Sequence, residues 1–317
     1  MLEIWGPLAG GLVLLVLGGD LLVRGAVRAA AALGVSPLVI GLTLVGFGTS
    51  LPELVTSVQA ALSGAPGIAH GNIVGSNIAN ILLIAGLSAV IFPIAVAASA
   101  LRRDAMVMLA VAAVFAALAG IVPMGRGLGA VFVAALGCYI VIAFRQERAA
   151  AGAEAGGTFE PEAARAARGV RLVLPLLLAA VGLGLVLAGG ILLVDGAATL
   201  AHVLEIPETV IGLTLVAVGT SLPELVTSVI AALRRQGDVA FGNIVGSNIY
   251  NILGIGGATG LIAPTQVPPA IAGFDAPLMV AVSVLLVVFA MTGLRIARWE
   301  GLVLLAGYGA YVGTIWS

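Results

Sequence analysis

Residues 39–58, VIGLTLVGFGTSLPELVTSV, decide the fold of this chain because they return almost unchanged as residues 210–229, VIGLTLVAVGTSLPELVTSV, at an offset of 171. Each copy is an apolar run that Gly-Thr-Ser-Leu-Pro-Glu interrupts near its middle. The interruption places a carboxylate, two hydroxyls and a helix-breaking proline in a segment that otherwise suits lipid. The sequence therefore predicts a duplicated membrane protein with an acidic residue, Glu53 or Glu224, deep in each half.

The composition places the rest of the chain in a membrane as well. Of the 317 residues, 61% are hydrophobic and 9% are charged, which is far more apolar than a soluble domain of this size. A transmembrane helix needs roughly 20 apolar residues to cross about 30 Å of hydrocarbon. Ten such runs predict an all-α integral membrane fold of ten transmembrane helices, at residues 7–23, 37–63, 71–92, 104–121, 126–145, 171–194, 207–233, 240–262, 275–292 and 299–316.

The longest polar stretch divides these helices into two groups of five. Residues 146–170 are rich in Ala, Gly, Glu and Arg and have no apolar face wide enough for a core. They predict a linker between a first repeat at residues 1–145 and a second repeat at residues 171–317. Because five is an odd number, two homologous halves must cross the membrane in opposite senses, which gives two inverted five-helix repeats.

The arginines predict the orientation independently. The chain has no lysine, and with these helices every arginine except Arg126 falls on one side of the membrane. The positive-inside rule places that side and the linker in the cytoplasm and both termini outside. A chain without lysine and rich in Ala and Gly indicates a prokaryotic cell (inner) membrane. His70 and His202 fall in short outer loops, where we expect solvated imidazoles.

The proline in each repeated stretch frees backbone oxygens. Pro52 has no N–H, so the carbonyl of Gly48 loses its helical partner, and a further glycine at Gly46 lets the backbone open locally. Pro223 and Gly219 do the same in the second copy. Freed carbonyls at membrane depth are tolerated only where they face protein or a wet cavity. The break therefore predicts oxygen ligands for a cation.

The same motif has a structural interpretation. Ser50-x-x-Glu53 and Ser221-x-x-Glu224 have the spacing of a capping box, which would start the second half-helix. A cap contributes about 1 kcal/mol, whereas an ionisable residue near the bilayer centre costs about 2.5 to 3.5 kcal/mol. Capping alone does not account for the carboxylates, so we interpret them as cation ligands that also cap.

A second motif is duplicated at the same offset, and it adds hydroxyl and amide groups. Its copies are GNIVGSNIAN at residues 71–80 and GNIVGSNIYN at residues 242–251. The Ser and the last Asn of each copy are four residues apart and share a helix face. The remaining asparagines suit polar helix packing in a membrane equally well; they are Asn72, Asn77, Asn243 and Asn248.

Together the two motifs predict an all-oxygen cation site at the membrane midplane, without Cys or His. Its side chains are two carboxylates, six hydroxyls and two amides: Glu53, Glu224, Thr49, Ser50, Ser76, Thr220, Ser221, Ser247, Asn80 and Asn251. Ca²⁺ takes about six to eight oxygens and is neutralised by two carboxylates, whereas Mg²⁺ dehydrates more reluctantly. The composition shows no nucleic-acid signature. The predicted partners are inorganic cations and the lipid bilayer, with no cofactor and no enzymatic activity.

These motif pairs resemble the alpha repeats of the calcium/cation antiporter superfamily, and specifically its compact prokaryotic sodium/calcium exchanger type. The alpha-1 motif covers residues 39–82 and the alpha-2 motif residues 210–253. The resemblance implies ion sites between helices 2, 3, 7 and 8, and alternating access in which helices 1 and 6 slide across that core. It assigns the two glutamates to Ca²⁺, and it adds backbone oxygens near Gly46 and Ala217 to the hydroxyl ligands for Na⁺ or Ca²⁺.

One position departs from the family pattern. Well-studied sodium-coupled relatives carry Asp where this chain has Asn251. We expect a secondary active antiporter that exchanges Ca²⁺ for Na⁺, because six hydroxyls and the freed carbonyls exceed what proton exchange needs. The alternative is a H⁺-coupled exchanger that uses the same two glutamates. A passive channel is disfavoured, since a deep site between inverted halves is typical of a transporter.

Overall fold

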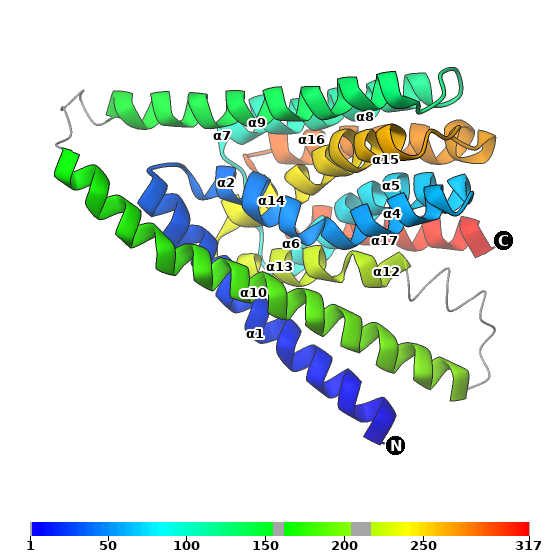
Figure 1. The fold of residues 1–317 in the computed structure, drawn as a ribbon, viewed down its shortest axis with the longest axis horizontal. Coiled ribbons are helices and arrows are strands. Elements are labelled where there is room, and N and C mark those ends of the chain that lie inside the picture. Colours follow the sequence, from blue (N-terminus) through cyan, green and yellow to red (C-terminus); the bar gives the residue numbers. More distant parts are fainter. Residues whose placement is uncertain (1, 155–161, 204–216, 317) are drawn as a thin grey trace.

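Helices make up nearly all of the part of the chain that the computed structural model describes, residues 2–154, 162–203 and 217–316 (Figure 1). In the first half, the α-helices and the π-helical segments, labelled η, are α1 (Leu2–Leu33), α2 (Pro37–Ile40), η1 (Gly41–Val45), α3 (Gly46–Thr49), α4 (Leu51–Leu62), α5 (Pro66–Ala79), η2 (Asn80–Ala85), α6 (Gly86–Ile91), α7 (Ala98–Ala100), η3 (Leu101–Ala105), α8 (Met106–Ala119) and α9 (Arg126–Glu154).

The described helices of the second half follow a similar order. They are α10 (Glu162–Val203), α12 (Ala217–Thr220), α13 (Leu222–Leu233), α14 (Gly237–Ile249), η5 (Tyr250–Gly256), α15 (Gly257–Ile262), η6 (Ile271–Asp275), α16 (Ala276–Met291) and α17 (Arg298–Trp316). Two short antiparallel strands, β1 (Ile94–Ala95) and β2 (Arg295–Ile296), pair between the halves.

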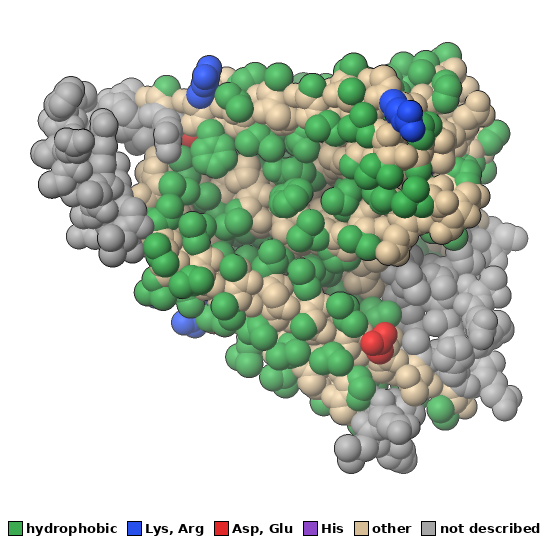
Figure 2. Space-filling view, in the orientation of Figure 1, with side chains coloured by type: hydrophobic (Ala, Val, Ile, Leu, Met, Phe, Trp, Pro, Cys, Tyr) green, Lys and Arg blue, Asp and Glu red, His purple; other side chains and the backbone are tan. Residues whose placement is uncertain are grey.

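Several of these helices have the length and composition of membrane spans. Among the described residues, five qualify, and a sixth does if the pair Pro37–Thr49 and Leu51–Leu62, bent by 44°, is one span. Hydrophobic side chains cover the face of the molecule seen in Figure 2, with few charged groups between them. This surface suits lipid, so the chain is a multi-pass membrane protein.

The helices beside the expected linker are longer than predicted. Helix α9 continues to Glu154 and α10 begins at Glu162, so both enter the range 146–170. Residues 155–161 lie outside the described part of the chain, as do residues 204–216, which include the start of the helix expected at 207–233.

Helices α1 and α10 lie side by side as a long pair (Figure 1) and touch through glycines. A Cβ on Gly11 would lie 2.8 Å from Gly189 O, and one on Gly18 would lie 2.8 Å from Gly182 O. A Cβ on Gly25 would likewise meet the α10 backbone, 2.8 Å from Pro175 O. These three glycines are spaced seven residues apart on α1, and at each of them the two backbones come into close contact. The pair therefore packs as one unit.

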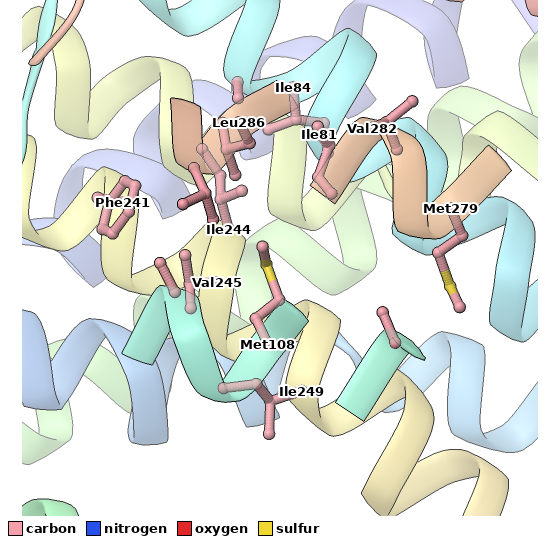
Figure 3. Close-up of a cluster of buried hydrophobic side chains, with 14 of the residues drawn as sticks. Ile81, Ile84, Met108, Phe241, Ile244, Val245, Ile249, Met279, Val282 and Leu286 are labelled. Carbon is pink, nitrogen blue, oxygen red and sulfur yellow. The ribbon is translucent and has the colours of Figure 1, made fainter. Parts of the chain in front are cut away.

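Helix α14 lies in the centre of the remaining bundle. Every residue from Val239 to Ile249 is buried. Figure 3 shows Phe241, Ile244, Val245 and Ile249 of this helix among apolar side chains of η2, α8 and α16. The helix that carries the second GNIVGSN motif is therefore held on several sides, which fixes the polar groups on it.

The expectation of a solvated His70 is wrong. Helix α5 begins at Pro66, so His70 lies inside it and is 0% exposed. Its Nε2 lies 2.9 Å from Thr265 Oγ1 in the loop after α15. His202 lies within α10 rather than in a loop. Helix α5 extends further than the apolar run in the sequence, because packing can bury a polar residue such as His70 near a helix end when it has a hydrogen-bond partner.

Candidate functional site

The two Gly-Thr-Ser-Leu-Pro-Glu stretches both break their helices at the serine. Helix α3 ends at Thr49 and α4 begins at Leu51, which leaves Ser50 between them. Ser221 lies between α12 and α13 in the same way. A proline occupies the first turn of α4 and of α13, where its missing N–H has no cost. The predicted break is confirmed in both copies.

The serines at the breaks do not cap their own helices. Neither Ser50 nor Ser221 forms a side-chain cap hydrogen bond. Ser50 Oγ donates instead to Glu224 Oε1 at 2.9 Å, and Ser221 Oγ donates to Glu53 Oε1 at 3.0 Å. The capping-box interpretation is therefore wrong, because the hydroxyls reach across to the other half of the chain.

These contacts bring the two glutamates into one buried site. Glu53 and Glu224 are each 1% exposed and lie in the first turns of α4 and α13. Their second oxygens, Oε2 in both, have no hydrogen-bond partner among the described residues. Within the same part of the chain neither carboxylate pairs with an arginine. Two ionised carboxylates are costly to bury unless a bound cation or a proton neutralises each of them.

Two asparagines from the second motif are also buried with unpartnered oxygens. Asn80 and Asn251 are each 1% exposed, and the amide oxygens of both lack a partner among the described residues. Asn80 starts η2 and Asn251 lies in η5, so both belong to π-helical segments, which often occur at functional sites. The η2 segment packs against α13 and the η5 segment against α4. Each asparagine therefore lies on a segment that packs against the glutamate-bearing helix of the other half.

The remaining predicted side chains surround this centre. Ser247 is buried, and its Oγ lies 3.5 Å from Gly46 O, while Ser76 is 5% exposed on α5. Thr49 Oγ1 donates to Val45 O at 3.0 Å. Thr220 is the last residue of α12.

The first residue of α12 is Ala217, whose side chain lies outside the described part of the chain. A pocket lies between α10 and the two breaks, and it is lined by Pro52 at the first break and by Thr220 and Pro223 at the second.

The sequence did not reveal that two asparagines hold the backbone of the two glutamates. It left the roles of Asn72 and Asn243 open between the site and helix packing, and each donates to the backbone oxygen of a glutamate, Glu53 O at 3.1 Å and Glu224 O at 3.3 Å. The signal was present in the sequence, because both asparagines recur at the offset of 171 together with the glutamates.

Chemically, the arrangement is a compact set of buried oxygens with two formal negative charges. Four of them, Oε2 of both glutamates and Oδ1 of Asn80 and Asn251, have no partner among the described residues. Unpaired carboxylate and amide oxygens are the ligands that hard cations such as Ca²⁺ and Na⁺ prefer. The residues present therefore fit a hard cation.

Comparison with known proteins relates the whole chain to one family. The family model described as sodium/calcium exchanger protein matches residues 4–145 and 174–317. The putative antiporter CaxA of Alkalimonas amylolytica is 38% identical over 309 residues, which cover 95% of each chain. The sodium/calcium exchanger MaX1 of Methanosarcina acetivorans is 37% identical over 336 residues, again 95% of each chain. A solved structure of the sodium-calcium exchanger NCX_Mj superimposes with a TM-score of 0.86 at 36% identity and covers 98% of each chain.

Proposed function

The chain belongs to the sodium/calcium exchanger protein family, and we propose that it exchanges Ca²⁺ for Na⁺ across a prokaryotic cell membrane. As a member of that family it is a multi-pass cation antiporter rather than an enzyme. The transported ions are its substrates, and no resident cofactor is part of the proposal.

One observation carries the proposed Ca²⁺ site: the reciprocal bonds from Ser50 to Glu224 and from Ser221 to Glu53. They hold one oxygen of each carboxylate and leave the other free to bind a cation. Two carboxylates neutralise one Ca²⁺, and neutral oxygens complete its coordination. The proposed ligands of Ca²⁺ and Na⁺ are Glu53, Glu224, Thr49, Ser50, Ser76, Asn80, Thr220, Ser221, Ser247 and Asn251, with backbone oxygens at Gly46 and Ala217.

The counter-ion follows from charge and from the kind of oxygen available. With Glu53 and Glu224 ionised, one Ca²⁺ leaves the site neutral, as do two Na⁺ or two protons. A proton needs no shaped oxygen cage, whereas Na⁺ does. The site offers six hydroxyls and two amides beyond the carboxylates, and NCX_Mj and MaX1 are both described as sodium/calcium exchangers. These features favour Na⁺.

The proton-coupled alternative rests on position 251. Because Asn251 is neutral, only the two glutamates at the centre can carry charge, and two protons would balance them as well as two Na⁺. In that case the hydroxyls would serve Ca²⁺ alone. The choice between the two counter-ions is therefore a choice between occupants of one site.

We further propose that two inverted five-helix repeats provide alternating access. The helices from α3 to α6, with the π-helical segment between α5 and α6, recur in order from α12 to α15, and an odd number of spans per repeat inverts the second copy. The glycine-packed pair α1 and α10, one helix from each repeat, would move as a unit against the bundle. In this topology both termini lie outside and residues 146–170 lie in the cytoplasm.

Reconstitution of the purified chain in liposomes tests the proposal directly. Uptake of ⁴⁵Ca²⁺ is measured against an outward Na⁺ gradient, a pH gradient or no gradient. Na⁺-driven uptake that persists when the pH gradient is collapsed supports Ca²⁺/Na⁺ exchange. Uptake that follows only the pH gradient assigns the protein to the proton-coupled alternative, and equal uptake without any gradient contradicts antiport.

A further inference from the structure

Two asparagines connect the helices of the second motif to the glutamate-bearing helices. On α5, Asn72 Nδ2 donates to Glu53 O at 3.1 Å and to Ser57 Oγ at 2.9 Å, both on α4. On α14, Asn243 makes the equivalent pair of bonds to α13. Its Nδ2 donates to Glu224 O at 3.3 Å and to Ser228 Oγ at 2.9 Å. One amide group thus holds one turn of the neighbouring helix at two points.

Asn243 has a further contact that involves the other half of the chain. Its Oδ1 lies 3.3 Å from Thr49 Oγ1, whose single hydroxyl proton can point either to this oxygen or to Val45 O. Asn243, Ser228 and Thr49 are all 0% exposed. The Asn243 amide therefore lies between the backbone of one glutamate and the hydroxyl of a threonine beside the other.

The turns held in this way carry the two carboxylates, and a serine of the other half of the chain already holds one oxygen of each carboxylate. Helices α4 and α13 begin directly after the breaks, and their first turns have no side-chain cap. The first N–H groups of a helix have no intrahelical acceptor, so an uncapped first turn frays easily. An asparagine that holds the backbone of such a turn therefore limits where the carboxylate on that turn can lie.

We propose that Asn72 and Asn243 are positioning residues that aim the Glu53 and Glu224 carboxylates at the bound cation. The inference rests on the proposed function, since it takes these glutamates as cation ligands. Neither asparagine touches the cation. Each acts through the backbone of a glutamate, and Asn243 also acts through Thr49.

The chain provides matched controls on the same two helices. Asn77 Nδ2 donates to Ile73 O at 2.6 Å, and Asn248 Nδ2 donates to Ile244 O at 3.0 Å, so each bonds within its own helix. Both are 1% exposed. Replacing them removes the same buried amide without cutting a connection to a glutamate.

The test compares Asn243→Ala with Asn248→Ala in the full-length chain. The KM for Ca²⁺ is measured from ⁴⁵Ca²⁺ uptake in liposomes, and the thermal unfolding midpoint is measured in Ca²⁺-free detergent. Loss of a contact that orients a metal ligand typically weakens metal affinity by about 10- to 100-fold. We expect Asn243→Ala to raise KM by at least about 10-fold and Asn248→Ala to leave it unchanged, although both variants lose some thermal stability. Asn72→Ala and Asn77→Ala repeat the comparison on α5.

Equal KM values in the two variants would overturn the inference, because a purely structural amide changes stability and not affinity. If Asn243→Ala does not fold, the KM of Ser228→Ala tests the positioning role instead. This variant removes the bond from Asn243 Nδ2 to Ser228 Oγ and keeps the bond to Glu224 O, so it should raise KM by a smaller factor. An unchanged KM overturns the inference as well.

Glu224→Gln separates this inference from the proposed function. If Glu224→Gln transports Ca²⁺ normally, the proposed cation site is wrong. If Glu224→Gln is inactive and Asn243→Ala has the wild-type KM, only the positioning role is wrong.

Discussion

Ser50 and Glu224 come from opposite halves of the chain, yet Ser50 Oγ donates to Glu224 Oε1 at 2.9 Å. Ser221 and Glu53 form the reciprocal bond at 3.0 Å. Each half therefore supplies the hydroxyl that orients the carboxylate of the other half. Both copies of the motif therefore contribute to one buried cluster.

The first prediction concerns the two carboxylates. Glu53→Gln and Glu224→Gln should each abolish Ca²⁺ transport while the protein still folds and inserts, because one carboxylate under-neutralises a dication in a site of low dielectric constant. Glu147→Gln is the control, since Glu147 bonds Arg103 on η3 and should not affect transport. Near-normal ⁴⁵Ca²⁺ flux in either purified glutamate variant of the site would remove these residues from the mechanism.

The second prediction concerns Asn251, where the chain departs from the sodium-coupled pattern. Asn251 Oδ1 has no partner among the described residues, and Asn251→Asp replaces its neutral amide with a negatively charged carboxylate. The change should shift the Na⁺ concentration for half-maximal exchange more than the KM for Ca²⁺, because a third Na⁺ needs charge that two glutamates do not supply. Transport assays at varied Na⁺ and fixed Ca²⁺ measure it. A variant whose Na⁺ dependence matches the wild type would contradict Na⁺ binding near this position.

The third prediction concerns the contact between α1 and α10. A Cβ on Gly182 would lie 2.7 Å from Gly18 O, whereas one on Gly184 would meet nothing within 4 Å. Gly182→Ala should therefore force the helices apart and destabilise the protein by about 1 to 3 kcal/mol, as overpacking does. Gly184→Ala on the same helix should leave the unfolding midpoint unchanged. Thermal unfolding in detergent measures both, and equal midpoints would show that the pair is not tightly packed.

The fourth prediction concerns topology. In a Cys138→Ala background, a cysteine at Ser63, which lies exposed at the end of α4, should react with an impermeant thiol reagent added to intact cells. A cysteine at Ala153, on the cytoplasmic side in the proposed topology, should react only after permeabilisation. The reverse labelling pattern would invert the orientation that the arginines predict.

Much of the fold could be predicted from the sequence because membrane insertion leaves a strong local signal. The apolar runs predicted a helical membrane protein, and the duplicated motifs predicted an exchanger of the sodium/calcium type; the family match confirms both. The ten-helix inverted repeat and the cytoplasmic linker remain predictions. Helix ends were less predictable, as His70 shows, since its burial depends on Thr265, a residue 195 positions away.

The sequence by itself determined which polar groups interrupt the apolar helices: two glutamates, their neighbouring hydroxyls and the asparagines of the second motif. Only the tertiary structure decided what each group contacts. Ser50 has the local spacing of a helix cap, but it bonds Glu224. Asn72 and Asn248 occur in the same repeated motif, yet Asn72 connects two helices and Asn248 bonds within one. The physical reason is that a hydroxyl or amide can satisfy its hydrogen bonds locally or across a helix interface with similar energy, so packing between distant segments selects the partner.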